Sequence, residues 1–209
     1  DWACEARRYY FNIVGKYGAQ VQALLKKAAT LDIQTICPLH GPILKENLGY
    51  YIGKYMTWSS YEPEDDGVLV AYASIHGNTK KAAEKMKEIL EAKGAKKVAI
   101  TDLSRDDMAE AIEDAFRYDK LVLAAASYDA SVFPCMETFL NKLTNKNYQN
   151  RKIAIIENGS WAPTAARVMK SYVEKMKKIT LCEKTVTIKS AMKDADVIAM
   201  EELADELLA

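Results

Sequence analysis

Residues 67–79 read GVLVAYASIHGNT, and this stretch decides the fold. Its first seven residues, 67–73, form a continuous apolar run of the length expected for a strand that is buried on both faces. A polar loop, residues 74–79, follows and runs into an amphipathic segment, residues 78–93, with apolar side chains at helical spacing. Gly94 then stands where a helix C-cap belongs. The stretch therefore predicts a strand, a loop and a helix in succession.

The rest of the chain repeats this alternation. Further strands are expected at residues 97–101, 120–126, 152–157 and 185–188, and further helices at residues 105–118, 133–144, 163–178 and 193–208. Right-handed crossovers between consecutive strands then require a mostly parallel sheet with helices on both faces. We therefore predict an α/β, doubly wound domain with a five-stranded parallel sheet over residues 67–209.

The composition argues against several classes of protein. Of the 209 residues, 49% are apolar and 28% are charged, as in an ordinary globular protein. Lys and Arg together number 29, as do Asp and Glu, and this balance argues against a nucleic-acid-binding protein. No apolar run approaches the roughly 18–20 residues that cross a bilayer, so no membrane segment is expected. The four cysteines form no CxxC pair, which favours free thiols in a protein of the reducing cytoplasm.

The chain divides at a short acidic linker, residues 62–66, which reads EPEDD. Residues 1–61 are expected to form a helix at about 5–29, a short strand at 34–37 and a helix at about 48–58. One strand cannot satisfy its backbone groups without a sheet. Because the sequence also begins without Met or a signal peptide, residues 1–61 are interpreted as the C-terminal remnant of an upstream domain. The alternative is a helical dimerisation arm, in which the aromatic residues near the end of this part form an interface.

Three loops follow strands and have unusual content, and in a parallel sheet such loops meet at one edge. The first, residues 74–79, leads into a helix whose free N–H groups and positive dipole end suit a phosphate. It matches neither GxGxxG nor GxxxxGKS/T, and it could instead be an ordinary capped helix start. The second, residues 126–134, contains Tyr128, and the third, residues 157–163, contains Trp161. A polar loop beside two aromatic side chains is typical of a site for a flat aromatic ligand.

These loops resemble those of flavodoxin-like domains. Residues 74–79 are similar to the family's loop for the phosphate of flavin mononucleotide (FMN), and residues 127–132 and 158–162 are similar to the two loops that flank the isoalloxazine ring. The resemblance implies the strand order 2-1-3-4-5 and a bound FMN. The candidate cofactor-binding residues are Ser74, Ile75, His76, Gly77, Asn78, Thr79, Ser127, Tyr128, Asp129, Ala130, Asn158, Gly159, Ser160, Trp161 and Ala162. Which of the two large aromatic side chains stacks on the ring is left open.

Residues 1–61 resemble the end of the metallo-β-lactamase-like domain of flavodiiron proteins, a family in which that domain precedes a flavodoxin domain. The similarity is carried by EARRYYFNI at residues 5–13 and by CPLHGP at residues 37–42. It implies that His40 corresponds to the last histidine ligand of the family's di-iron site, for which an imidazole is suited. The family's HxExDH motif is absent, and His76 is the only other histidine. One imidazole cannot hold two irons, so the chain is expected to bind FMN but no iron pair, with a metal role for His40 only in a full-length protein.

The resemblance implies an FMN-binding electron-transfer module of a flavodiiron oxygen or nitric oxide reductase. Electrons would pass from rubredoxin or another donor through FMN to a di-iron site outside this chain, in a head-to-tail homodimer of the full-length protein. The full-length parent would be an oxidoreductase, and this chain alone would only transfer electrons. If the carboxylates of Asp129 and Glu157 both point to the ring, they would lower the flavin potential. The alternative is a stand-alone flavodoxin-like module that binds FMN or another ligand without reductase activity.

Overall fold

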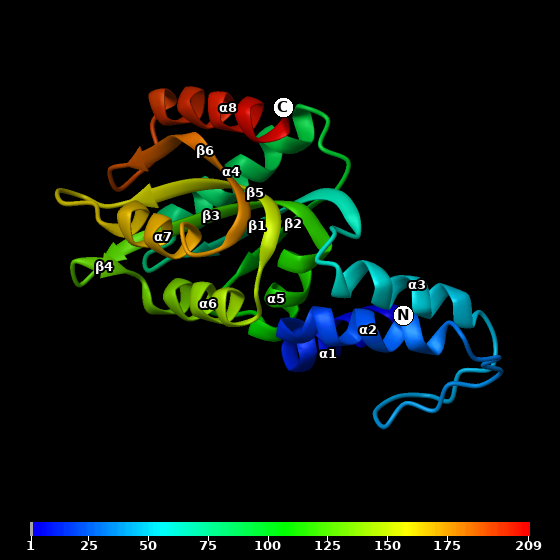
Figure 1. Ribbon diagram of the computed structural model, residues 1–209. Helices are drawn as coiled ribbons and strands as arrows, with labels where there is room; N and C mark the ends of the chain where they lie inside the picture. Colours follow the sequence, from blue (N-terminus) through cyan, green and yellow to red (C-terminus); the bar gives the residue numbers. More distant parts are fainter. Residues whose placement is uncertain (1) are drawn as a thin grey trace.

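A six-stranded sheet forms the centre of the computed structural model, which describes residues 2–209. The strands are β1 (Asp65–Ala73), β2 (Val98–Asp102), β3 (Tyr118–Tyr128), β4 (Ser131–Val132), β5 (Gln149–Asn158) and β6 (Lys177–Ile188). The α-helices are α1 (Trp2–Tyr9), α2 (Gly18–Ala28), α3 (Leu48–Ser59), α4 (Asn78–Ala92), α5 (Met108–Arg117), α6 (Pro134–Asn145), α7 (Ala165–Val173) and α8 (Asp194–Leu208). Figure 1 shows the sheet between two helical layers, with α1, α2 and α3 projecting from one end.

The five long strands are parallel and lie in the order β2-β1-β3-β5-β6. β4 has two residues and pairs antiparallel with the last residues of β3, so it forms a short hairpin at the carboxyl end of this central strand. With β4 set aside, the strands follow the order 2-1-3-4-5 that the resemblance implies. The α/β, doubly wound, flavodoxin-like fold is therefore confirmed, with β4 as an addition that the sequence did not predict.

Both faces of β1 are buried, as its continuous apolar run predicts. Val68 and Val70 pack under α4 and α8, in one apolar cluster. Leu69 and Ala71 point to the other face and pack with residues of α5, α6 and α7. Because successive side chains of a strand point to opposite faces, an apolar run of this kind fits only between two helical layers.

The last strand differs most from the prediction. β6 begins at Lys177, inside a predicted helix, and α7 ends before it. The register shifts between Ile153 and Ile155 of β5, so residues 182–184 of β6 bulge. The carboxylate of Glu206 in α8 accepts hydrogen bonds from two backbone N–H groups of this bulge. The strand lies at the sheet edge, carries charged residues and depends on a side chain from a later helix, so its sequence does not look like that of a strand.

The predicted helix over residues 5–29 is interrupted. α1 is followed by a π-helical turn (Tyr10–Val14) and a 3-10 turn (Gly15–Tyr17) before α2 begins at Gly18. The hydroxyl of Tyr61 accepts a hydrogen bond from the N–H of Gly18 (3.1 Å) and donates one to the carbonyl of residue 15 (2.8 Å). A Cβ at Gly18 would lie 2.7 Å from the Tyr61 ring, so this close approach requires glycine.

The predicted strand at residues 34–37 is wrong. Ile36 forms an isolated antiparallel bridge with Leu44, and the loop between these two residues contains His40. A single bridge without neighbouring strands does not make a sheet. The helix predicted at about 48–58 is confirmed as α3.

Aromatic side chains of α3 and of the π-helical turn that follows α1 pack on the α5 side of the domain. The ring of Phe11 stacks on that of Phe116 in α5, with centroids 4.1 Å apart. Tyr10 and Trp58 are buried in the same apolar cluster, whereas Tyr50 at the start of α3 is half exposed. The aromatic residues of α3 therefore divide between the core and the surface. The assignment of residues 1–61 to a remnant of another domain stays a prediction.

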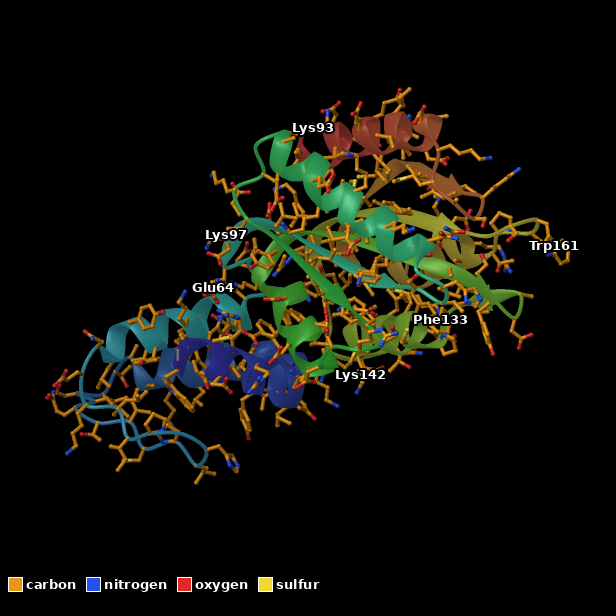
Figure 2. All side chains as sticks on the ribbon, turned by 180° about the vertical axis from the view of Figure 1, so that it is seen from behind. Glu64, Lys93, Lys97, Phe133, Lys142 and Trp161 are labelled. Carbon is orange, nitrogen blue, oxygen red and sulfur yellow. The ribbon has the colours of Figure 1, made fainter. Side chains whose placement is uncertain are left out.

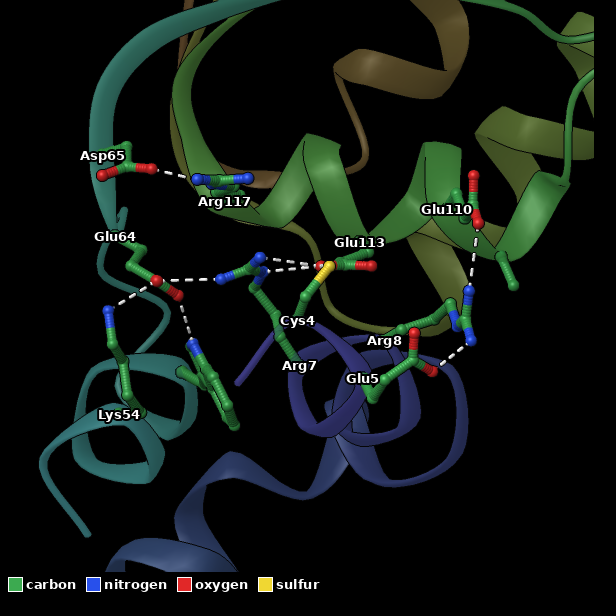
Figure 3. A network of polar contacts seen from close by, with 12 residues as sticks. Cys4, Glu5, Arg7, Arg8, Lys54, Glu64, Asp65, Glu110, Glu113 and Arg117 are labelled. Carbon is green, nitrogen blue, oxygen red and sulfur yellow. Dashed lines mark hydrogen bonds and ion pairs between the residues drawn. The ribbon is translucent and has the colours of Figure 1, made fainter. Parts of the chain in front are cut away.

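A buried ion-pair network joins α1 to the linker and to α5 (Figure 3). The Arg7 guanidinium contacts Glu64 (Nη1–Oε1, 2.8 Å) and Glu113 (Nη2–Oε1, 2.8 Å). Glu64 also accepts hydrogen bonds from Lys54 Nζ (2.6 Å) and Trp58 Nε1 (2.7 Å). Burial alone would raise the pKa of Glu64, but its three donors hold that pKa below the usual value. Burial raises the pKa of Glu113, which has fewer donors.

The four cysteines are free, and Cys182 is buried while Cys37 is exposed. Within residues 2–209, no helix has both the length and the apolar character needed to cross a membrane.

Candidate functional site

The loops that follow β1, β3 and β5 meet at the carboxyl edge of the sheet. They form the rim, defined as residues 74–79, 127–130 and 158–162. β1 and β3 are neighbours there, while the connections that follow them lead to opposite sides of the sheet. This is the switch point at which open parallel sheets bind ligands. Figure 2 shows Trp161 of the rim at the end of the molecule opposite to Glu64 and the helices α1–α3.

Two adjoining cavities lie at the rim. The inner cavity, of about 150 Å³, is lined by residues of the first loop and by the ends of β3 and β5. The outer cavity, of about 300 Å³, is lined by residues of the second and third loops. They share Ser127, Gly159 and Ser160. Among the cofactor-binding residues predicted from the sequence, Gly77 alone lines neither cavity, so the structure brings the predicted loops together.

The first loop ends in a tight turn that leads into α4. The backbone N–H of Gly77 donates to Ser74 Oγ (3.0 Å), and Gly77 has a left-handed φ of +90° that favours glycine. Apart from the adjoining chain, no atom lies within 4 Å of the position that a Cβ would take at Gly77. α4 begins at Asn78, so its first-turn N–H groups and its positive dipole end adjoin the inner cavity. This local structure suits an anion.

The second loop is the hairpin between β3 and β4. Asp129 and Ala130 occupy its tip with φ values of +49° and +56°, as in a two-residue turn with left-handed backbone at both positions. Tyr128, just before the tip, is 49% exposed, and its ring centroid lies 5.7 Å from that of Phe133. The Thr164 hydroxyl donates to the carbonyl of Ser131 (2.7 Å), which ties this hairpin to the third loop.

The third loop combines a fixed start with a projecting aromatic side chain. A Cβ on Gly159 would lie 2.8 Å from Pro163, so the turn requires glycine. Ser127 Oγ accepts hydrogen bonds from the N–H groups of Thr164 (2.8 Å) and Ala165 (3.2 Å), so this hydroxyl caps α7. Trp161 is 91% exposed beside the outer cavity. A large apolar ring in this position offers a surface for a flat ligand.

The predicted lowering of the flavin potential by Glu157 requires its carboxylate to point to the ring. In the structure this carboxylate does not point to the rim. It is buried and accepts hydrogen bonds from the N–H of Ala166 (2.8 Å) and from Thr187 Oγ1 (2.8 Å). It therefore holds the start of α7 against β6. Of the two acidic residues considered, Asp129 alone is exposed at the rim.

The sequence missed Ser190 and Thr164, which also line the two cavities. Ser190 lies in the loop that follows β6. The loops that follow parallel strands share one edge of the sheet, and this rule, if extended to the last strand, would have identified Ser190. Thr164 precedes α7, and nothing in its sequence surroundings distinguishes it. Asn158 lines the inner cavity, but both ends of its amide are bonded to the backbone of Ser190.

His40 lies in a different part of the molecule. It lines a mostly apolar cavity of about 510 Å³ between α1, α3 and the loop that contains it, together with Trp2, Leu44 and Tyr55. Its ring centroid is 5.3 Å from that of Tyr9, and the side chain is exposed. No group of three or more His, Cys, Asp or Glu side chains among residues 2–209 is arranged to hold a metal ion. The role of His40 as an iron ligand stays a prediction.

Comparisons with known proteins agree with this geometry. A family model for the flavodoxin domain matches residues 69–189. An uncharacterized protein of Methanocaldococcus jannaschii is 24% identical over 207 residues, which cover 97% of this chain and 52% of that protein. An anaerobic nitric oxide reductase flavorubredoxin of Aeromonas hydrophila is 23% identical over 160 residues, which cover 75% of this chain and 32% of that protein.

Among solved structures, rubredoxin oxygen:oxidoreductase of Desulfovibrio gigas has a TM-score of 0.91 at 18% identity, and the match covers 99% of this chain and 52% of that chain. At this identity the likeness shows the fold, which includes α1–α3 as well as the sheet. The chain spans about half the length, or less, of these relatives. Because the matched residues 69–189 make up more than half of its length, the chain belongs to the flavodoxin domain family.

Proposed function

We propose that the rim binds FMN, with the phosphate in the inner cavity and the isoalloxazine ring in the outer one. The observation that carries this proposal is the pairing of two adjoining cavities of different chemistry at the switch point of the sheet. The inner cavity offers hydroxyl and amide groups and the start of α4, and the outer one offers Tyr128 and Trp161. Membership of the flavodoxin domain family supports the same cofactor.

The residues present fit this group. Gly77 leaves open space on the side where a Cβ would lie, and Thr79 is buried at the first turn of α4. Trp161 is 91% exposed beside the outer cavity, so its aromatic face is open to a ligand. Bound FMN would supply one- and two-electron chemistry. The residues of the chain would bind its phosphate, hold its ring between two aromatic side chains and leave one ring edge accessible.

The finer role is electron transfer within a flavodiiron oxygen or nitric oxide reductase, from rubredoxin or another donor to a di-iron site to which His40 would contribute. The names of the relatives support a redox partner. The loop between α2 and α3, which contains His40, lies at the end of the molecule opposite to Trp161. This arrangement favours transfer between two copies in a head-to-tail homodimer over transfer within one copy. The reducing cytoplasm is the proposed location.

FMN uptake tests the proposal directly. We expect the purified protein to bind FMN stoichiometrically and to quench its fluorescence. Tyr128→Ala and Trp161→Ala should each weaken binding about two- to ten-fold, because one aromatic contact on the ring is lost.

Tyr50→Ala is the matched control, since Tyr50 is 50% exposed, like Tyr128, but lies on α3 away from the rim. Failure of the wild-type protein to bind FMN would overturn the proposed function. An equal loss of affinity in the control and in the rim variants would overturn the role of the two aromatic side chains.

A further inference from the structure

The loop that follows β6 reaches the inner cavity and adds a fourth segment to it. Ser190 in this loop lines the cavity together with Ser74, Asn78 and Thr79 of the first loop. Ser190 has a left-handed φ of +66°, a conformation that is uncommon for a serine.

The side chain of Asn158 bonds the backbone of Ser190 in this conformation. Its Nδ2 donates to the carbonyl oxygen of Ser190 (2.8 Å), and its Oδ1 accepts from the Ser190 N–H (3.2 Å). The neighbouring N–H of Gly159 donates to the carbonyl of Ile188 (3.0 Å), so the ends of β5 and β6 are held together. The Asn158 amide is thus bonded to Ser190 at both ends, and the residue is only 8% exposed. These two bonds fix the orientation of the Asn158 amide toward the loop that follows β6, although Asn158 is the last residue of the strand that leads to the ring loop.

The hydroxyl of Ser190 is aimed across the inner cavity at the start of α4. Asn78 Nδ2 lies 3.5 Å from Ser190 Oγ, at the outer limit of a hydrogen bond. Each group is thus only weakly held by the other and remains able to bind an oxyanion. Among residues 2–209, no lysine or arginine lines this cavity. A phosphate there would depend on hydroxyl and amide donors, on the imidazole of His76 and on the start of α4, so a single hydroxyl matters more than it would beside a lysine or arginine.

We propose that Ser190 is a phosphate-binding residue and that Asn158 is its positioning residue, so that this pair selects FMN over riboflavin. The inference rests on the proposed function, because it concerns one end of the same site. It assigns to Asn158 a role at the phosphate rather than at the ring.

The test is a comparison of FMN and riboflavin affinity, measured by quenching of flavin fluorescence. Ser190→Gly removes the hydroxyl and suits the positive φ, so the loop keeps its backbone conformation. We expect FMN affinity to fall about ten-fold, the lower end for a hydrogen bond to a charged group, with riboflavin affinity unchanged. Asn158→Ala should lower FMN affinity by at least as much. The double variant should lose no more than the more affected single variant, because both changes remove one interaction.

Asn147→Gly is the control, because Asn147 has a similar φ of +62° but precedes β5, at the opposite edge of the sheet. If Asn158→Ala fails to fold, Ser190→Gly alone carries the test. An unchanged ratio of FMN to riboflavin affinity in Ser190→Gly would overturn the inference while the proposed function stands. Equal affinity of the wild-type protein for the two flavins would also overturn it. Binding of neither flavin would overturn the proposed function itself.

Discussion

Replacement of Arg7 by Met tests whether the network of Figure 3 holds α1 on the α/β domain. The Arg7 side chain is 4% exposed and neutralises two buried carboxylates, those of Glu64 and Glu113. Removal of one partner from a buried ion pair costs about 3–5 kcal/mol, because a charge is left buried without compensation. Glu64 keeps Lys54 and Trp58 as donors, so its loss is small. We therefore expect the lower end of the range, a decrease of about 3 kcal/mol in the free energy of unfolding.

The remaining cost comes from Glu113, which would keep only the thiol of Cys4 as a side-chain donor (3.1 Å). Burial already raises the pKa of Glu113 in the wild-type protein, and loss of the Arg7 cation raises it further. A carboxyl whose pKa is higher in the folded state stabilises the protein below its unfolded pKa and loses that effect as pH rises. The deficit of Arg7→Met should therefore shrink as pH falls from 7 toward 5. Arg7→Met combined with Glu113→Gln should recover much of it at neutral pH.

The assay is urea unfolding followed by tryptophan fluorescence and circular dichroism at several pH values. Arg8→Met is the matched control, because Arg8 pairs with Glu5 and Glu110, both largely exposed. Exposed pairs contribute about 0–1 kcal/mol, so this variant should be close to the wild-type protein. Equal effects of the two substitutions, or a deficit of Arg7→Met that does not change with pH, would refute the reasoning.

Three further predictions concern single residues and are checked by urea unfolding. Gly77→Ala should lower the free energy of unfolding by about 1–2 kcal/mol, because φ is +90° there although space is free; no change would mean that the loop can adopt another turn. Ala130→Gly should raise it by about 0.5–1 kcal/mol, because glycine relieves the left-handed φ at the hairpin tip, and a decrease would contradict this turn geometry. Arg151→Lys should lower it by about 2–3 kcal/mol, because an ammonium cannot reproduce the planar set of donors, whereas the exposed control Arg105→Lys should change little. In the structure the buried guanidinium of Arg151 donates to the backbone carbonyls of Tyr61, Phe116, Tyr118, Gln149 and Asn150. Equal effects of the two lysine substitutions would contradict this role of the guanidinium.

The parallel sheet could be predicted because each central strand carries its own signal, whereas the strand order was implied only by the resemblance to flavodoxin-like domains. The runs in β1, β3 and β5 are apolar on both faces, and this pattern needs no knowledge of distant residues. β6 could not be delimited in this way, because its bulge depends on the carboxylate of Glu206. The break between α1 and α2 depends in the same way on the hydroxyl of Tyr61. Local patterns do not report such long-range contacts.

The loops of the site could be predicted, but the directions of their side chains could not. The rule for parallel strands places the ends of β1, β3 and β5 at one edge whatever their side chains do. Whether Glu157 points to the rim or to the start of α7 depends on which neighbour needs a hydrogen-bond partner, and in the structure the start of α7 does. Asn158 is likewise committed to Ser190. Polar side chains at strand ends therefore serve the scaffold and the ligand, and only the structure separates the two roles.

The central claim is that FMN binds at the rim, and an NMR titration of isotope-labelled protein with FMN tests it most directly. We predict one saturable process that shifts the backbone amide signals of residues 75–79, 128–131 and 159–162, with the signal of Ser190 among them. Signals of the loop around His40 should stay unchanged. Shifts centred on the cavity that His40 lines, or no shifts at millimolar FMN, would contradict the account.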